Sequence, residues 1–217
     1  LMRLPILFLL LTVMIDSMGI GLILPVMPEL IEEVTGGTLA QAALWGGLLS
    51  TVFALMQFLF GPMLGSLSDR FGRRPILLTA LGVMAIDYVI MALAGSIWLL
   101  LIGRIVAGIT AATQTAASAA IADLSDPKKK AQNFGLVGAA IGFGFVLGPL
   151  LGGFLGGFGT RAPFIAAAVL AGMNMVLGYF VLPETVTDAI RRPIERSRLN
   201  PLGAFKAFLE EPLTMLL

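Results

Sequence analysis

Six apolar segments, each close to the length of a membrane-spanning helix, constrain this chain more than any other feature. A helix needs about 20 apolar residues to cross the hydrocarbon core of a bilayer. Hydrophobic residues fill 58% of the 217 positions and charged residues only 12%, whereas a soluble domain carries roughly 25% charged residues. We therefore expect an all-α membrane protein with six transmembrane helices. They cover residues 4–24, 43–64, 76–94, 97–122, 134–158 and 163–182.

The basic residues predict how these helices are oriented. Of the 14 lysines and arginines, Arg161 lies in a loop on one side and Arg104 lies within the fourth span, while the other 12 lie on the opposite side. Loops rich in lysine and arginine stay in the cytoplasm during insertion. We therefore predict a multi-pass protein whose amino terminus and carboxyl-terminal segment are both cytoplasmic.

The composition changes after the sixth span. Residues 186–211 are polar and basic, and the apolar segment 212–217 reads as the start of a seventh span. We therefore expect three regions: a six-helix bundle over residues 1–185, a cytoplasmic basic linker over 186–211, and the start of a further helix over 212–217. The alternative is a complete six-span protein with a short amphipathic tail.

The residue types that are absent exclude several functions. The chain has no cysteine and no histidine, which removes disulfide frameworks, the usual zinc sites and histidine-based acid/base catalysis. No nucleophile with a neighbouring base stands within the spans, so we expect no enzymatic activity and no cofactor. The formal net charge of +1 gives no reason to expect a nucleic-acid partner.

Three ionisable residues lie within the predicted spans: Asp16, Asp87 and Arg104. A charge at mid-bilayer costs on the order of 3 kcal/mol, so such residues are usually paired or functional. At about 1.5 Å of rise per residue, all three fall in one layer slightly outside the midplane. One aspartate alone would neutralise the arginine. The second leaves a surplus carboxyl in a desolvated setting, which suggests proton exchange.

Three carboxamides also lie within the spans. Gln57, Gln114 and Asn174 are candidates to bind a substrate, but hydrogen bonding between helices is the more common role of such residues. The residues alone leave both alternatives open.

The fifth predicted span carries glycines at four-residue spacing, at positions 144, 148, 152 and 156. This repeat leaves one helix face without side chains, so a neighbouring backbone can approach closely. Pro149 removes a hydrogen bond of the helix and bends it. Close static packing and a moving hinge or seal are both consistent with this pattern.

Residues 65–74, between the second and third spans, read Gly-Ser-Leu-Ser-Asp-Arg-Phe-Gly-Arg-Arg. The chemistry predicts a tight, basic cytoplasmic turn in which Asp69 and Arg73 pair. This string resembles, at every position, the loop signature of the major facilitator superfamily, G-x-L-x-D-R-x-G-R-[RK]. Residues 144–153 likewise resemble the G-x-x-x-G-P-x-x-G-G signature of its drug/proton antiporters, and residues 16–28 and 102–110 look most like its tetracycline-efflux branch.

The resemblance implies a fold and a function. The fold is the amino-terminal half of a major facilitator, made of two inverted three-helix repeats, with a substrate site between the two halves. The function is proton-coupled efflux of a drug-like or small amphipathic solute across the bacterial cytoplasmic membrane by alternating access. Its partners are that solute, protons, the bilayer and a missing carboxyl-terminal half. If the substrate is tetracycline-like, a metal chelate is one candidate form.

The resemblance also implies roles for individual residues. Asp16, Asp87 and Arg104 would couple protons, and Gln57, Gln114 and Asn174 remain the candidates for substrate binding. Ala111 and Gln114 depart from the small residues that tetracycline exporters usually have there. The open alternatives are a sugar or metabolite exporter and a non-transporting six-span scaffold. The residues with an implied gating role are Gly65, Asp69, Arg73, Asp123, Gly144, Gly148, Pro149 and Gly152.

Overall fold

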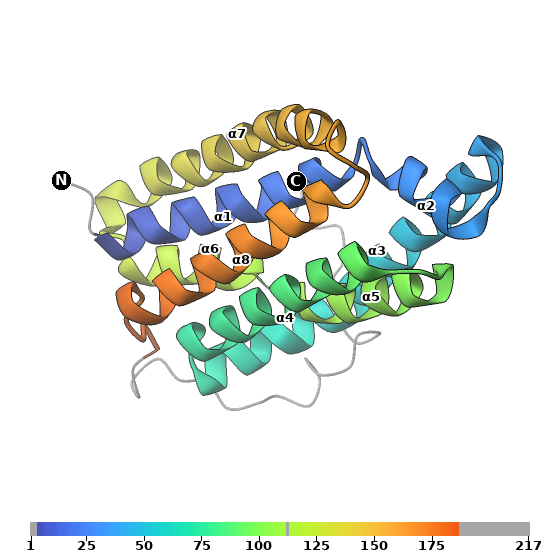
Figure 1. The fold of residues 1–217 in the computed structure, drawn as a ribbon. Helices are drawn as coiled ribbons and strands as arrows, with labels where there is room; N and C mark the ends of the chain where they lie inside the picture. The colour runs from blue at the N-terminus through green and yellow to red at the C-terminus, as the bar shows by residue number, and fades with distance from the viewer. Residues whose placement is uncertain (1–3, 112, 187–217) are drawn as a thin grey trace, which may run out of the picture.

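The structure is a computed structural model that describes residues 4–111 and 113–186. Within these residues every regular element is a helix, and six helical segments are long and apolar enough to cross a membrane. They lie side by side as a bundle (Figure 1). The expected six-span fold is therefore confirmed. The expected linker, apart from Val186, and the expected start of a seventh span lie outside the described residues.

The six spans run in alternating directions between two ends of the bundle. We name these ends the Arg73 end, where α1 begins and α4 starts, and the Glu33 end, where the short helix α2 lies. The elements in chain order are α1 (Leu4–Ile23), α2 (Met27–Thr35), α3 (Leu39–Phe71), α4 (Arg73–Leu93), α5 (Ile97–Thr110), α6 (Thr113–Leu124), the 3-10 turn η1 (Pro127–Lys129), α7 (Lys130–Gly156) and α8 (Ala162–Val181).

The second span is much longer than expected, and the turn predicted over residues 65–74 is confined to Gly72. Helix α3 runs for 33 residues, from the Thr38 cap to Phe71, and α4 begins only two residues later. Gly72 alone makes the corner, with φ of 115°, a backbone conformation that favours glycine. Gly65 therefore lies inside a helix, because no residue between it and Gly72 interrupts the helical hydrogen bonds.

The fourth span is divided, whereas the sequence predicted one continuous helix over residues 97–122. Helix α5 ends at Thr110, Ala111 takes a non-helical conformation, and α6 begins at Thr113. The Thr110 hydroxyl donates to the carbonyl oxygen of Val106 at 2.8 Å, a bond that competes with the helix and bends it. Irregular backbone at this depth is tolerated where it borders a cavity.

Helix α2 was not expected, because residues 25–42 were read as a loop. Pro28 stands in its first turn, where a missing N–H is harmless, and Gly36 ends it with φ of 64°. Leu30 and Ile31 are fully buried while Glu33 on the other face is exposed. The helix is thus amphipathic and packs its apolar face onto the Glu33 end of the bundle.

The packing of the spans repeats itself in inverted order. The first span, α1, packs on the fifth, α7, and the fourth, α5, packs on the second, α3. The third, α4, packs on the sixth, α8. Exchanging the first three spans with the last three leaves this pattern unchanged, which is the arrangement expected of two inverted three-helix repeats.

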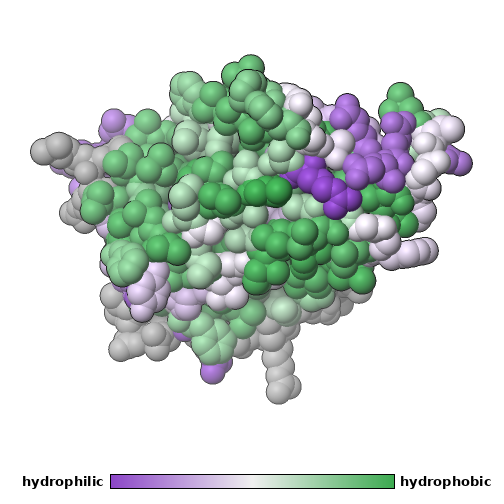
Figure 2. Space-filling model, viewed as in Figure 1, coloured by the Kyte–Doolittle hydropathy of each residue, from purple (hydrophilic) through white to green (hydrophobic). Residues whose placement is uncertain are grey.

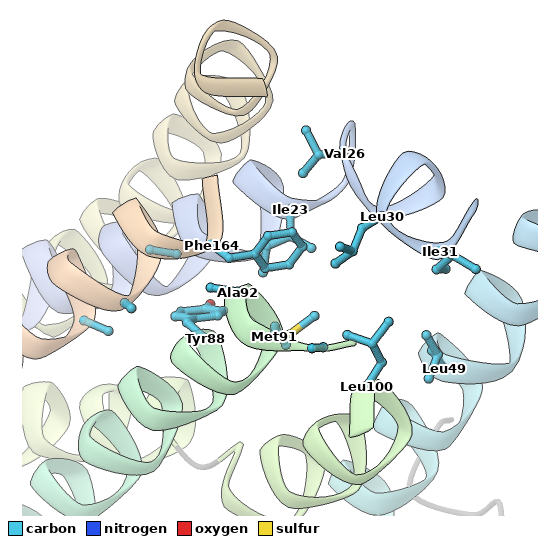
Figure 3. Packing of buried hydrophobic residues seen from close by; sticks show 14 of the residues in the cluster. Ile23, Val26, Leu30, Ile31, Leu49, Tyr88, Met91, Ala92, Leu100 and Phe164 are labelled. Atoms are coloured by element: carbon cyan, nitrogen blue, oxygen red, sulfur yellow. The ribbon is translucent and has the colours of Figure 1, made fainter. Parts of the chain in front are cut away.

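Apolar side chains fill the space between helices and also cover the outside. Phe164, Leu30, Met91 and Leu100 belong to a buried cluster that joins α2, α4, α5 and α8 near the Glu33 end (Figure 3). The face drawn in Figure 2 is mostly hydrophobic, with hydrophilic residues gathered toward α2. Exposed apolar surface of this extent is typical of contact with lipid or with another protein.

Candidate functional site

A cavity of about 380 Å³ opens between the helices and collects most of the predicted site residues. Side chains from α1, α3, α4, α5, α6 and α7 line it, and so does the break between α5 and α6. The polar and charged side chains in its wall include Asp16, Gln57, Asp87, Arg104 and Gln114. The sequence placed the three charged residues at one depth, and the structure brings them to one cavity.

Asp87 and Arg104 form an ion pair across the interface between α4 and α5. Arg104 Nη2 donates to Asp87 Oδ2 at 2.7 Å, and Asp87 is only 2% exposed. Gly103 allows this approach, because a Cβ placed there would stand 2.6 Å from Asp87 Oδ1. The guanidinium also lies 5.6 Å from the centre of the Phe53 ring. One aspartate therefore neutralises the arginine.

Asp16 is the surplus carboxyl. It is 7% exposed, and no lysine or arginine in the described residues lies within ion-pair distance of it. Gln114 lies against this carboxyl and donates from Nε2 to the neighbouring Ser17 hydroxyl at 3.3 Å. The site thus holds one paired and one unpaired carboxyl beside the same cavity.

The three carboxamides separate into two environments. Gln57 and Gln114 line the cavity. Asn174 is 2% exposed and lies between α8 and α1, where its Oδ1 accepts a hydrogen bond from the Thr12 hydroxyl at 3.3 Å. It is not part of the cavity wall, so its position favours hydrogen bonding between helices over contact with a substrate.

The glycines of α7 bring its backbone against α1, as their spacing predicted. A Cβ added at Gly144 would stand 2.5 Å from the Met14 carbonyl oxygen, and one at Gly148 would stand 2.6 Å from that of Met18. Gly152 faces the Leu22 carbonyl in the same way. Pro149 lies beside Gly21 of α1. The two helices are therefore packed with no room for a single added methyl group.

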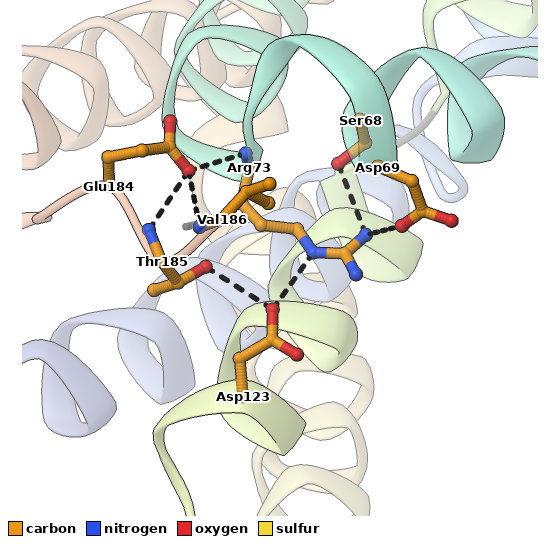
Figure 4. A network of polar contacts seen from close by, with 7 residues as sticks. All are labelled: Ser68, Asp69, Arg73, Asp123, Glu184, Thr185 and Val186. Carbon is orange, nitrogen blue, oxygen red and sulfur yellow. Dashed lines mark hydrogen bonds and ion pairs between the residues drawn. The ribbon is translucent and has the colours of Figure 1, made fainter. Parts of the chain in front are cut away.

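A charge cluster at the Arg73 end contains the predicted Asp69–Arg73 pair and adds Asp123 to it (Figure 4). Arg73 Nη1 lies 2.5 Å from Asp69 Oδ1, and its Nε donates to Asp123 Oδ2 at 3.1 Å. Ser68 accepts a further bond from the same guanidinium at 3.4 Å. The arginine thus joins the end of α3, the start of α4 and the end of α6. Gly65 is outside this cluster, about one helical turn before Asp69 in α3.

Glu184 is a member of this cluster that sequence reasoning missed. Its Oε1 accepts hydrogen bonds of 2.9 Å from the backbone N–H groups of Arg73, Thr185 and Val186. It thereby caps the start of α4, and it fills the space above Gly72 that a side chain there would need. Thr185 donates to Asp123 at 3.3 Å. The only signal in the sequence is an acidic residue directly after the sixth span.

A second polar cluster, also unexpected, lies at the Glu33 end. Glu33 accepts from the Thr160 hydroxyl at 2.6 Å and from Arg161 at 3.1 Å, and Arg161 also donates to the Ala92 carbonyl at 3.0 Å. The Thr160 and Arg161 hydrogen bonds lower the pKa of Glu33 below its ordinary value. The cluster ties α2 to the α7–α8 turn and to the end of α4.

Comparisons with known proteins agree with this arrangement. The chain is 47% identical to the class C tetracycline resistance protein of Escherichia coli over 195 residues, which are 90% of this chain and 48% of that protein. It is 48% identical to the class G tetracycline resistance protein of Vibrio anguillarum over 176 residues, which are 81% and 44% of the two chains.

A solved structure is also similar. The human organic anion transporter MFSD10 (TETRAN) matches with a TM-score of 0.80 and 28% identity, over 92% of this chain and 54% of that one. The chain thus spans about half the length of the relatives that it matches. In a comparison with protein families, the sequence model of the Major Facilitator Superfamily matches residues 9–217 of this chain. With the inverted packing of its spans and the charges at its cavity, the chain belongs to the Major Facilitator Superfamily.

Proposed function

We propose that this chain forms the amino-terminal half of a proton-coupled exporter, which moves tetracycline or a similar small amphipathic solute out of the cell by alternating access. The observation that carries the proposal is the unpaired Asp16 carboxyl beside the Asp87–Arg104 ion pair, both in the wall of one cavity. The printed names of the bacterial relatives support the tetracycline class. A bacterial inner membrane is the corresponding location, with the Arg73 end in the cytoplasm.

The charges of the cavity explain why a proton gradient can drive such a cycle. A proton that binds Asp87 removes the charge that holds Arg104, and a proton that binds Asp16 removes an unpaired charge from the membrane interior. Either event changes the electrostatic energy of the cavity by several kcal/mol. A membrane potential adds about 2.3 kcal/mol per proton per 100 mV. Proton binding therefore shifts the balance between conformations that open to opposite sides.

The two polar clusters are suited to hold the ends of the bundle while the cavity opens. At the Arg73 end, Arg73 joins three helices through Asp69 and Asp123, and Glu184 joins the segment after α8 to the start of α4. In our proposal these bonds keep the six spans together as one rigid half. The close α1–α7 packing around Gly148 also keeps these helices together.

A second six-helix half completes the cavity in this proposal. Residues 1–185 form the bundle, 186–211 connect the halves in the cytoplasm, and 212–217 begin the first helix of the other half. The relatives, which are about twice as long as the matched segment, support this division. Gln57 and Gln114 then supply hydrogen-bonding groups from this half to the substrate.

Uptake by inside-out membrane vesicles tests the proposal. Vesicles that carry the transporter should accumulate tetracycline with Mg²⁺ when the lumen is acidified, and a protonophore should abolish this accumulation. Asp16→Asn and Asp87→Asn should each lose it, while Glu29→Gln, a matched change on the exposed face of α2, should retain it. Full gradient-driven uptake in both aspartate variants would overturn the assignment of these residues.

A further inference from the structure

Tyr88 lies among the three charged residues of the cavity, although no sequence pattern pointed to it. It follows Asp87 in α4, it is 5% exposed, and it lines the cavity with Asp16 and Arg104. Figure 3 shows its ring within the buried cluster near Phe164 and Ala92. A phenol in a purely apolar core needs a partner for its hydroxyl, so the place where this hydroxyl points carries information.

The side chain of Tyr88 extends from α4 so that its hydroxyl lies against α1. A Cβ built on Gly19 of α1 would stand 2.6 Å from Tyr88 Oη and 3.3 Å from Cζ. The phenol therefore occupies the space that a side chain at position 19 would need. Gly19 is three residues after Asp16, on the same face of the helix and about 4.5 Å along its axis. The oxygen of Tyr88 is thus placed on the face of α1 that carries the unpaired carboxyl.

The charged residues that line the cavity together with Tyr88 are Asp16 of α1, Asp87 of α4 and Arg104 of α5. The α8 residues in the same buried cluster as Tyr88 are apolar: Phe164, Ala167, Ala168 and Ala171. Tyr88 therefore shares the cavity wall with the unpaired carboxyl and the ion pair, while its ring belongs to a buried apolar cluster.

We propose that Tyr88 is a positioning residue for proton transfer, whose hydroxyl links the Asp16 carboxyl to the Asp87–Arg104 ion pair. The hydroxyl accepts a proton from the Asp16 carboxylic acid while its own proton passes to the Asp87 carboxylate, directly or through cavity water. Asp16 ends as carboxylate, Asp87 ends as carboxylic acid, and the phenol is unchanged. Arg104 loses its counter-charge in the same event. This inference rests on the proposed proton-coupled function.

The two tyrosines of the chain provide a matched pair of variants. Tyr88→Phe removes only the hydroxyl, and Tyr179→Phe makes the same change at a residue that is 61% exposed on α8. The full-length transporter, with its second half, is assayed in inside-out vesicles for two rates. One is proton-driven uptake of tetracycline as a function of lumenal pH, and the other is exchange of labelled for unlabelled tetracycline without a gradient.

Tyr88→Phe should slow proton-driven uptake at least tenfold, because a positioned proton-transfer group contributes about 10²- to 10⁴-fold, and it should alter the pH profile. Exchange without a gradient should stay within about twofold of wild type, which a merely structural defect would not allow. Tyr179→Phe should match wild type in both assays. A wild-type rate and pH profile in Tyr88→Phe would overturn the inference.

A second variant tests the geometry. Gly19→Ala displaces the hydroxyl without removing it, so it should slow proton-driven uptake in the wild-type background. In the Tyr88→Phe background the nearest ring atom lies 3.3 Å away, and the same change should have little further effect. Additive losses would overturn the inference. If the wild type shows no gradient-driven uptake at all, the proposed function itself fails. If the wild type and Tyr88→Phe both show normal uptake, only the inference about Tyr88 fails.

Discussion

The contact between α1 and α7 gives the prediction that the structure specifies most sharply. Gly148→Ala adds one methyl group to the face of α7 that meets α1. That methyl would stand 2.6 Å from the Met18 carbonyl oxygen and 2.8 Å from the Cα atom of Gly21. Carbon atoms in contact prefer about 3.5–4.0 Å. Both obstacles are backbone atoms, so α7 must retreat by about 1 Å rather than turn a side chain aside.

The magnitude follows from two opposing terms. Overpacking of this kind costs about 1–3 kcal/mol, while alanine gains up to about 1 kcal/mol over glycine in a helix. Gly153→Ala, five residues along the same helix, gains the same propensity, because a Cβ there meets nothing within 4 Å among the described residues. The difference between the two variants therefore isolates the packing term, which we expect to be about 2 kcal/mol.

Thermal unfolding of the two purified variants in detergent measures this difference. A gap of about 2 kcal/mol corresponds to about 4–8 °C in melting temperature for a chain of this size. Gly148→Ala should unfold at the lower temperature, and Gly153→Ala should unfold at or slightly above the wild-type temperature. Equal melting temperatures for the two variants would contradict this prediction, because they would show that α1 and α7 are not in backbone contact at Gly148.

Three further predictions concern the polar contacts. Arg73→Ala leaves the carboxylates at the Arg73 end without their shared partner and should lower the free energy of unfolding by about 1–3 kcal/mol, measured by thermal unfolding; an unchanged melting temperature would contradict this. Glu33→Gln should be less stable than wild type at neutral pH. Because the pKa of Glu33 is lowered in the folded state from an ordinary 4.5, the difference should be complete above that value and vanish as the pH falls through the lower pKa. Thr12→Val removes the bond to Asn174 and should cost about 1 kcal/mol, with an unchanged KM for tetracycline; a raised KM would return Asn174 to the substrate site.

The sequence predicted the fold well because a bilayer imposes simple rules. Each span must be apolar over about 20 residues, so all six were located to within a few residues at most ends. The exceptions are places where polar residues continue a helix beyond the membrane. Helix α3 reaches Phe71 because the polar residues after Gly65 are compatible with a helix, and only the positive φ of Gly72 stops it. Hydrophobicity carries no signal for such an extension.

The sequence predicted which charged residues form the site, but it did not predict which of them pair with one another. A rise of 1.5 Å per residue placed Asp16, Asp87 and Arg104 at one depth, and they do share a cavity. Depth says nothing about rotation around the helix axis. It could not decide which aspartate pairs with Arg104, and it could not separate Gln57 in the cavity from Asn174 between two helices.

The contacts between distant segments were the least predictable. Glu184 lies 111 positions from Arg73, and Thr160 lies 127 positions from Glu33. Each of these residues reads on its own as an ordinary polar group in a loop. Their partners are defined only when the inverted packing of the six spans brings the loop ends together.

Proton movement during transport measures directly whether Asp16 and Asp87 couple protons to substrate. Inside-out vesicles carrying the full transporter, in weakly buffered medium without an imposed gradient, receive a pulse of tetracycline while the external pH is recorded. We expect substrate entry to move protons outward in wild-type vesicles, and we expect Asp87→Asn and Asp16→Asn each to abolish this movement. Equal proton movement in wild type and both variants would contradict the claim that these carboxyls couple protons to transport.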